Sequence, residues 1–152
     1  MIILIAFLIG IVAGLRSMAG PAIVSWAAHA GVFPVEGTWL GFMGSQWTSW
    51  LLTLAAAAEL VTDQLPSTPS RTVPMQFGAR IFSGALCGAT VSVQSSGILL
   101  GALFGATGAV IGTLGGAAFR WWLSERVKSD RYAALIEDVI AIGSGVVIVA
   151  CL

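Results

Sequence analysis

Long apolar stretches with very few charged residues are the feature of this sequence that most limits its fold. Of its 152 residues, 57% are hydrophobic and 9% are charged, and the mean hydropathy is +0.95. A soluble domain typically carries about 25% charged residues, so a chain of this composition cannot cover a water-exposed surface. The lipid bilayer is therefore the expected solvent, and helices are the expected spanning elements because each satisfies its own backbone groups.

Turn and loop signals divide the chain into five or six hydrophobic segments. The clearest loop is 63–74, which holds three prolines and shows no apolar periodicity. We expect one all-α domain over residues 1–152, a polytopic transmembrane helical bundle. Its four later helices are predicted at 46–62, 75–93, 98–123 and 131–152.

Basic residues predict the orientation of this bundle in a membrane. The loop at 63–74 contains Arg71, and the loop at 124–130 contains Arg126 and Lys128. The connections at 31–45 and 94–97 contain neither lysine nor arginine. By the positive-inside rule we expect a multi-pass protein of the cell membrane with both charged loops in the cytoplasm.

The first apolar stretch is interrupted. Residues 2–14 are too short to span a membrane alone, and the following Arg16-Ser17-Met18-Ala19-Gly20-Pro21 disfavours a continuous helix. A second apolar run covers 22–30. Two geometries fit: one long broken helix, or a hairpin of two short segments with Arg16 at its tip. The positive-inside rule favours the hairpin, which brings Arg16 to the cytoplasmic side.

Two arginines occur inside apolar segments, each in the frame G-x-R-x-x-x-G, at Arg16 and Arg80. A charge in such surroundings is costly and normally has a partner or a task. Counting inward from the cytoplasmic loops at about 1.5 Å per residue puts Arg80, Glu59 and Glu137 about 10 Å deep. We therefore predict one buried polar layer as the candidate binding site, with Arg71 in reach of head groups. Its residues are Arg16, Glu59, Asp63, Arg71, Arg80, Glu137 and Asp138.

This layer has two interpretations. It is either a structural network of ion pairs that locks helices together, or a polar cavity open to the cytoplasm. The cavity would bind an ion, a small anionic solute or a lipid head group. The zero formal net charge disfavours nucleic acid as a partner, whereas membrane lipids are expected partners. The sequence indicates no cofactor and no metal site.

Glycines recur at spacings of three and four along the predicted helix 98–123, so they share one face. Glycines on one face let a second helix approach to backbone contact. The partner is either another helix of the same chain or a second copy in a homo-oligomer. The glycines expected to pack helices are Gly84, Gly88, Gly101, Gly105, Gly108 and Gly112, with Gly97 and Gly115 continuing the same series.

A weak internal duplication divides the chain into 1–73 and 74–152. After each arginine frame comes A-A-x-x-E-x-V, at 55–61 and 133–139. Repeats of this kind are common in transporters, where sites lie at the repeat interface. Because these words are short and rich in alanine, a chain of this biased composition can also contain them by chance.

Three words together resemble a family of small bacterial inner-membrane proteins known only as a domain of unknown function. They are Gly14-Leu15-Arg16-Ser17, the stretch 62–72 and the stretch 134–142. In that family the middle word often has lysine where this chain has Gln64. The resemblance covers nearly the whole chain and implies a polytopic helical protein of the inner membrane. It implies no activity, substrate or catalytic residue.

We predict a small transporter or channel-like protein as the leading function. A non-enzymatic assembly protein that packs through its glycines is the alternative. A lipid-modifying enzyme using Asp63 and the loop at 65–72 ranks last, because no nucleophile and base can be named. No catalytic residue is therefore assigned.

Overall fold

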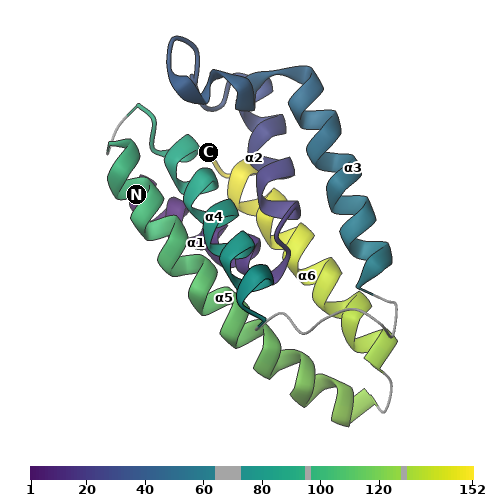
Figure 1. The fold of residues 1–152 in the computed structure, drawn as a ribbon. Helices are drawn as coiled ribbons and strands as arrows, with labels where there is room; N and C mark the ends of the chain where they lie inside the picture. Colours follow the sequence, from purple (N-terminus) through teal and green to yellow (C-terminus); the bar gives the residue numbers. More distant parts are fainter. Residues whose placement is uncertain (64–72, 95–96, 128–129) are drawn as a thin grey trace.

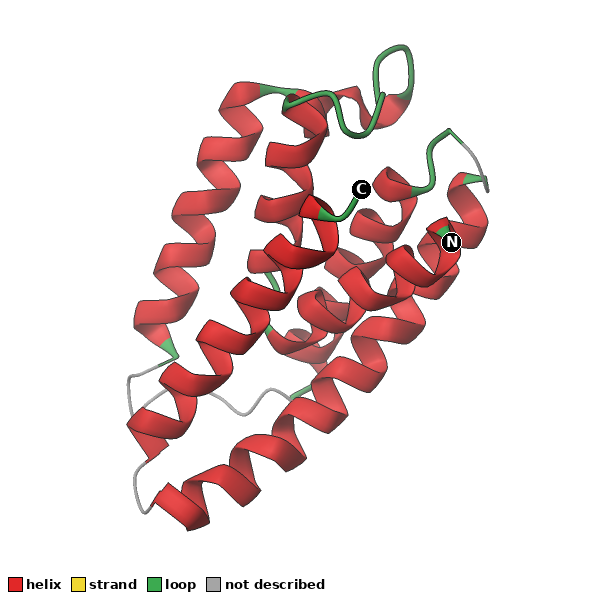
Figure 2. Cartoon of the chain, turned by 180° about the vertical axis from the view of Figure 1, so that it is seen from behind, coloured by secondary structure: helices red, strands yellow, loops and turns green. Residues whose placement is uncertain are grey.

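The computed structural model describes residues 1–63, 73–94, 97–127 and 132–152, and the backbone alone of residues 130 and 131. Throughout these ranges the regular structure is helical, which confirms the predicted all-α class (Figures 1 and 2). The elements are α1 (Ile2–Leu15), α2 (Ala19–His29), the 3-10 helix η1 (Trp39–Gly44), α3 (Gln46–Thr62), α4 (Pro74–Val91), α5 (Ile98–Val127) and α6 (Asp130–Ala150).

Two segments predicted as loops contain helical residues. The expected loop at 124–130 begins later, because α5 continues to Val127. Its last turn, Ser124-Glu125-Arg126-Val127, is polar but contains no glycine or proline, so nothing local stops the helix. The expected loop at 31–45 contains η1, and the Oγ1 atom of Thr38 caps it by accepting a hydrogen bond from the Leu40 N–H at 3.2 Å.

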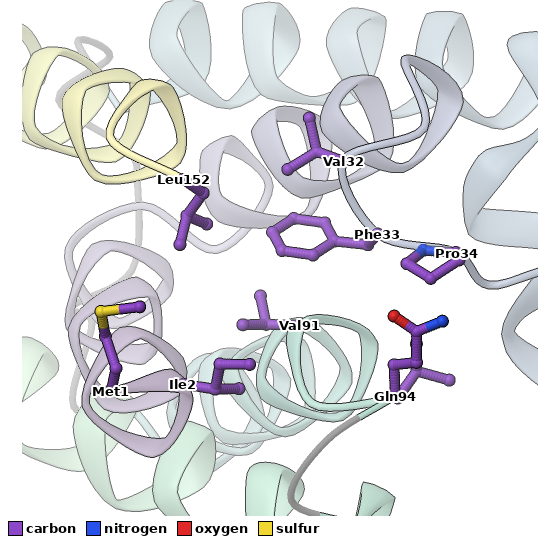
Figure 3. A pocket seen from close by; sticks show the side chains of 9 residues that line it. Met1, Ile2, Val32, Phe33, Pro34, Val91, Gln94 and Leu152 are labelled. Atoms are coloured by element: carbon purple, nitrogen blue, oxygen red, sulfur yellow. The ribbon is translucent and has the colours of Figure 1, made fainter.

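The chain reverses between α1 and α2, so the structure has the hairpin geometry. Gly20 lies directly against Ala13, where a Cβ atom on the glycine would come within 2.9 Å of the alanine Cβ. At the far ends of the two helices, Met1 and Phe33 line the same hollow of about 240 Å³ (Figure 3). Arg16 is therefore at the tip of a hairpin whose two open ends lie together.

This hairpin occupies the centre of the bundle. Helix α1 packs against α4, α5 and α6, and α2 packs against α3, α4 and α6 (Figure 1). The composition of α1 explains its central position. This helix has no polar face, and a helix that is apolar all round is normally buried. The four longer helices surround it and alternate in direction: α3 ends and α4 begins at the end of the bundle where α5 ends and α6 begins.

The glycines of α5 bring three helices to backbone contact. A Cβ atom on Gly101 or Gly105 would overlap the carbonyl oxygens of Gly88 and Gly84 in α4. Further along α5, a Cβ atom on Gly108 or Gly112 would overlap carbonyl oxygens of α1. The series therefore packs α5 against α4 with its first half and against α1 with its second half, within one chain.

Large apolar side chains cover much of the outer surface. Trp47 is 81% exposed on α3, Phe82 is 71% exposed on α4 and Val139 is 73% exposed on α6. Soluble monomers rarely expose large contiguous apolar patches. In the part of the chain that the structure describes, two helices are long and apolar enough to cross a membrane, Ile98–Val127 and Tyr132–Ala150.

Candidate functional site

The hairpin tip leaves helix ends inside the bundle, where their backbone groups need partners. The last carbonyls of a helix and its first N–H groups have no partner within the helix itself. At the end of α1, the Nη1 atom of Arg80 donates to the carbonyl oxygens of Gly14 and Leu15 at 2.9 and 2.7 Å. The Thr113 hydroxyl of α5 also donates to the Gly14 oxygen, at 3.1 Å. A buried cation therefore caps the C-terminus of α1.

A carboxylate caps the start of α2 in the complementary way. Glu59 of α3 accepts hydrogen bonds from the backbone N–H and the hydroxyl of Ser17, both at 2.9 Å. It also accepts the N–H of Met18 at 2.8 Å. Cations stabilise helix C-termini and anions stabilise N-termini, because the helix dipole runs between them. The two charges at the tip are thus each on the helix end that favours them.

The two caps are also joined to each other. The Nη2 atom of Arg80 lies 3.5 Å from the Glu59 Oε1 atom, and the Arg80 side chain is 2% exposed. Each charge offsets part of the cost of burying the other. Arg80 and Glu59 therefore act as one unit that satisfies both sides of the helix break.

Arg16 makes a second unit at the same tip. Its side chain is fully buried, and its guanidinium pairs with Asp63 through Nη1 and with Asp138 through Nη2. Asp63 follows directly after α3, and Asp138 lies in α6. One arginine in the hairpin turn thus connects two outer helices that face it from different sides.

Glu137, the residue before Asp138 in α6, lies near a third arginine. Its Oε2 atom lies 4.0 Å from the Nη1 atom of Arg120 on α5. Successive residues of a helix point about 100° apart, which separates Glu137 from Asp138. The depth count predicted both carboxylates in one layer, but it could not assign them to different neighbours. The predicted polar layer also left out Arg120, which falls within the predicted helix 98–123.

A cleft opens beside the tip between α3 and α4. It has a volume of about 310 Å³, and its polar lining includes the carboxylates of Glu59 and Asp63. No arginine or lysine is among its described lining residues, and both buried arginines point their charges into the tip instead. Ser17 and Gln76 are polar members that sequence reasoning missed, because neither carries a charge to mark it. The polar lining is Ser17, Glu59, Thr62, Asp63 and Gln76.

The remaining candidates contribute less to this site. Arg71 lies outside the described residues. Among those residues, no group of three or more His, Cys, Asp or Glu side chains is placed to hold a metal ion. His29 is at the other end of the bundle, with its Nδ1 atom 3.0 Å from the Gly44 carbonyl oxygen. The site therefore consists of the tip, its two charged units and the cleft.

Comparisons with protein-family models, with curated proteins and with solved structures find no match to this chain. The resemblance to small inner-membrane proteins stays an expectation from the sequence.

Proposed function

We propose that this is an integral membrane protein of transporter or channel type, and that the cleft beside the hairpin tip binds a small cation. The observation that carries the proposal is a broken helix pair with charged caps at a cleft lined by two carboxylates. Discontinuous helices with their ends at a buried site are a recurrent design of ion-coupled transporters. Such irregular backbone is tolerated at membrane depth where protein surrounds it or water lines it.

The dimensions of the hairpin support a membrane setting. Helix α1 has 14 residues and is about 21 Å long. The polar layer was counted at about 10 Å from the opposite end of the bundle. The two lengths add up to about the 30 Å thickness of the hydrocarbon core. A re-entrant hairpin entering from one side would therefore bring its tip to the depth at which the outer helices carry their carboxylates.

The charges of the site favour a cation over the anionic solute that the sequence also allowed. Among the described residues that line the cleft, Glu59 and Asp63 are carboxylates and none is an arginine or a lysine. Both arginines at the tip are directed to backbone carbonyls or carboxylates. The cleft presents carboxylate, hydroxyl and amide oxygens, which are the ligands that hard cations prefer. An anion would meet Glu59 and Asp63 first.

Charge movement in proteoliposomes tests this proposal. We expect concentration jumps of Na⁺, K⁺ or NH₄⁺ to evoke currents on a solid-supported membrane. Asp63→Asn should reduce these currents at least about tenfold, which corresponds to 1.4 kcal/mol of lost ion binding. The substitution retains the size of the side chain while it removes a charge from the cleft.

Gln94→Ala is the matched control, because Gln94 lines the hollow at the opposite end of the bundle. It should leave the currents at the wild-type level. Currents evoked by chloride or phosphate but by none of the cations would contradict the assignment of charge. Absence of current with every ion would contradict transport and favour an assembly role.

The assembly role loses its original motive in this fold. Six glycines of the series on α4 and α5 contact backbone or side chains within the chain. A homo-oligomer would need another surface, such as the exposed apolar faces of α3, α5 and α6. We propose that membrane lipids cover these faces.

A further inference from the structure

Helix α3 differs from its neighbours in how it is held. It stands at the edge of the bundle and packs against α2 and η1 (Figures 1 and 2). Its first half is joined to α2 by polar contacts inside the interface. The Oγ atoms of Ser49 and Ser25 are 3.0 Å apart, and the Trp26 Nε1 donates to the Thr53 Oγ1 at 2.9 Å. These bonds hold the first half of α3 in a defined register.

The second half of α3 has hollows on both sides. The polar cleft lies between it and α4, and an apolar groove of about 280 Å³ lies on its other side, lined by residues of α2 and by Ile142 of α6. The four consecutive alanines 55–58 face these two hollows, two of them lining each. Alanine side chains are short and reach only a little way across these hollows. Few side-chain contacts therefore oppose a movement of the second half of α3.

The end of α3 is attached to the tip through its carboxylates. Glu59 accepts the three hydrogen bonds of Ser17 and Met18 and faces Arg80, while Asp63 pairs with Arg16. Ser17 lines the cleft and Ala19 lines the groove. The contact of Glu59 with the start of α2 therefore forms the partition between the polar hollow and the apolar one.

We propose that α3 is a hinged gate. Its first half is the fixed hinge on α2, and Glu59 and Asp63 latch its second half onto the hairpin tip. When Glu59 and Asp63 release the tip, the second half of α3 moves away from it. The polar cleft then becomes continuous with the backbone of the tip and with the apolar groove. The purpose of the gate, to admit a cation to the tip, rests on the proposed function. Its motion can be measured without any ligand.

Distances between spin labels test the hinge in a Cys151→Ser background, since Cys151 is exposed and Cys87 is buried. One pair, Val61→Cys with Val139→Cys, reports on the latched end. The other pair, Leu51→Cys with Val147→Cys, reports on the hinge end. All four positions carry exposed apolar side chains, so the labels should not disturb the packing.

Neutralising the latch with Glu59→Gln and Asp63→Asn should lengthen or broaden the distance at the latched end. A bend of about 20° at Thr53 acts over eight residues, or about 12 Å, and moves Val61 by ~4 Å. The distance at the hinge end should stay unchanged. The matched control, Glu125→Gln on the exposed last turn of α5, should alter neither pair.

Unchanged distances at both ends, with helicity retained, would overturn the gate. A change at both ends would also overturn it, because the helix would then move as a whole. If the double variant loses its helical circular dichroism, Glu59→Asp decides, since it retains the charge but shortens the reach. That variant should broaden the latched-end distance alone, and an unaltered distribution would refute the latch. Cation currents can fail while these distances change, so the two proposals are separable.

Discussion

Gly105→Ala is expected to destabilise the protein by about 3 kcal/mol, at the upper end of the usual cost of overpacking. The added methyl group would overlap the carbonyl oxygen of Gly84 and lie within 3.0 Å of the Gly88 Cα. Both of these atoms belong to backbone, which has no rotamer to change. Helices α4 and α5 would have to separate, and the contacts along their whole interface would weaken. The loss is measurable as a lowered midpoint of denaturant unfolding in detergent micelles.

Gly115→Ala on the same helix is the matched control. No neighbouring atom lies within 4 Å of a Cβ atom built there. Alanine has a higher helix propensity than glycine, so this variant should be neutral or more stable by up to ~1 kcal/mol. If both variants lost the same stability, glycine would matter for the helix itself and not for its contact with α4.

Arg16→Met is expected to cost about 3–5 kcal/mol, because removal of one partner leaves buried charges uncompensated. Asp63 and Asp138 both pair with this arginine, which is fully buried. Methionine fills a similar volume, so the main loss is electrostatic. The same denaturant measurement, combined with circular dichroism, reports it.

A second substitution separates the charge effect from packing. Adding Asp138→Asn to Arg16→Met should recover part of the lost stability, since it removes one of the two orphaned carboxylates. Arg126→Met is the surface control. Its guanidinium is exposed and lies 4.7 Å from the centre of the Trp122 ring, an interaction worth about 0.5–1 kcal/mol at most. If Arg16→Met lowered the free energy of unfolding by no more than Arg126→Met does, the buried ion-pair unit would be refuted.

The members of the charged site were open to prediction because charge in apolar sequence is conspicuous. Arg16, Arg80, Glu59 and Asp63 all lie at or beside the tip. Which of these charges pair with each other could not be predicted from the sequence. Counting residues gives the depth of a side chain along its helix, but it does not tell which neighbouring helix that side chain faces. The uncharged contributors, Ser17, Thr113 and Gln76, gave no signal in the sequence.

Helix boundaries were likewise predicted correctly in some places and not in others. The α3 range Gln46–Thr62 agrees with the prediction, since a change from loop to apolar residues marks its start and Asp63 begins a proline-rich stretch. For α5 the apolar residues end before the helix does. Hydropathy reports where a helix would leave lipid, whereas the helix itself ends where local backbone signals stop it.

Composition and local spacing are enough to specify the helical class, the break after Leu15 and the glycine positions that permit close approach of helices. Only the folded arrangement reveals which helices approach each other, with α5 packed against both α4 and α1, and which charges pair at the tip. It also reveals that α1 and α2, the two shortest α-helices, lie at the centre. Those outcomes depend on the relative rotation and tilt of helices far apart in the chain, which no local pattern encodes.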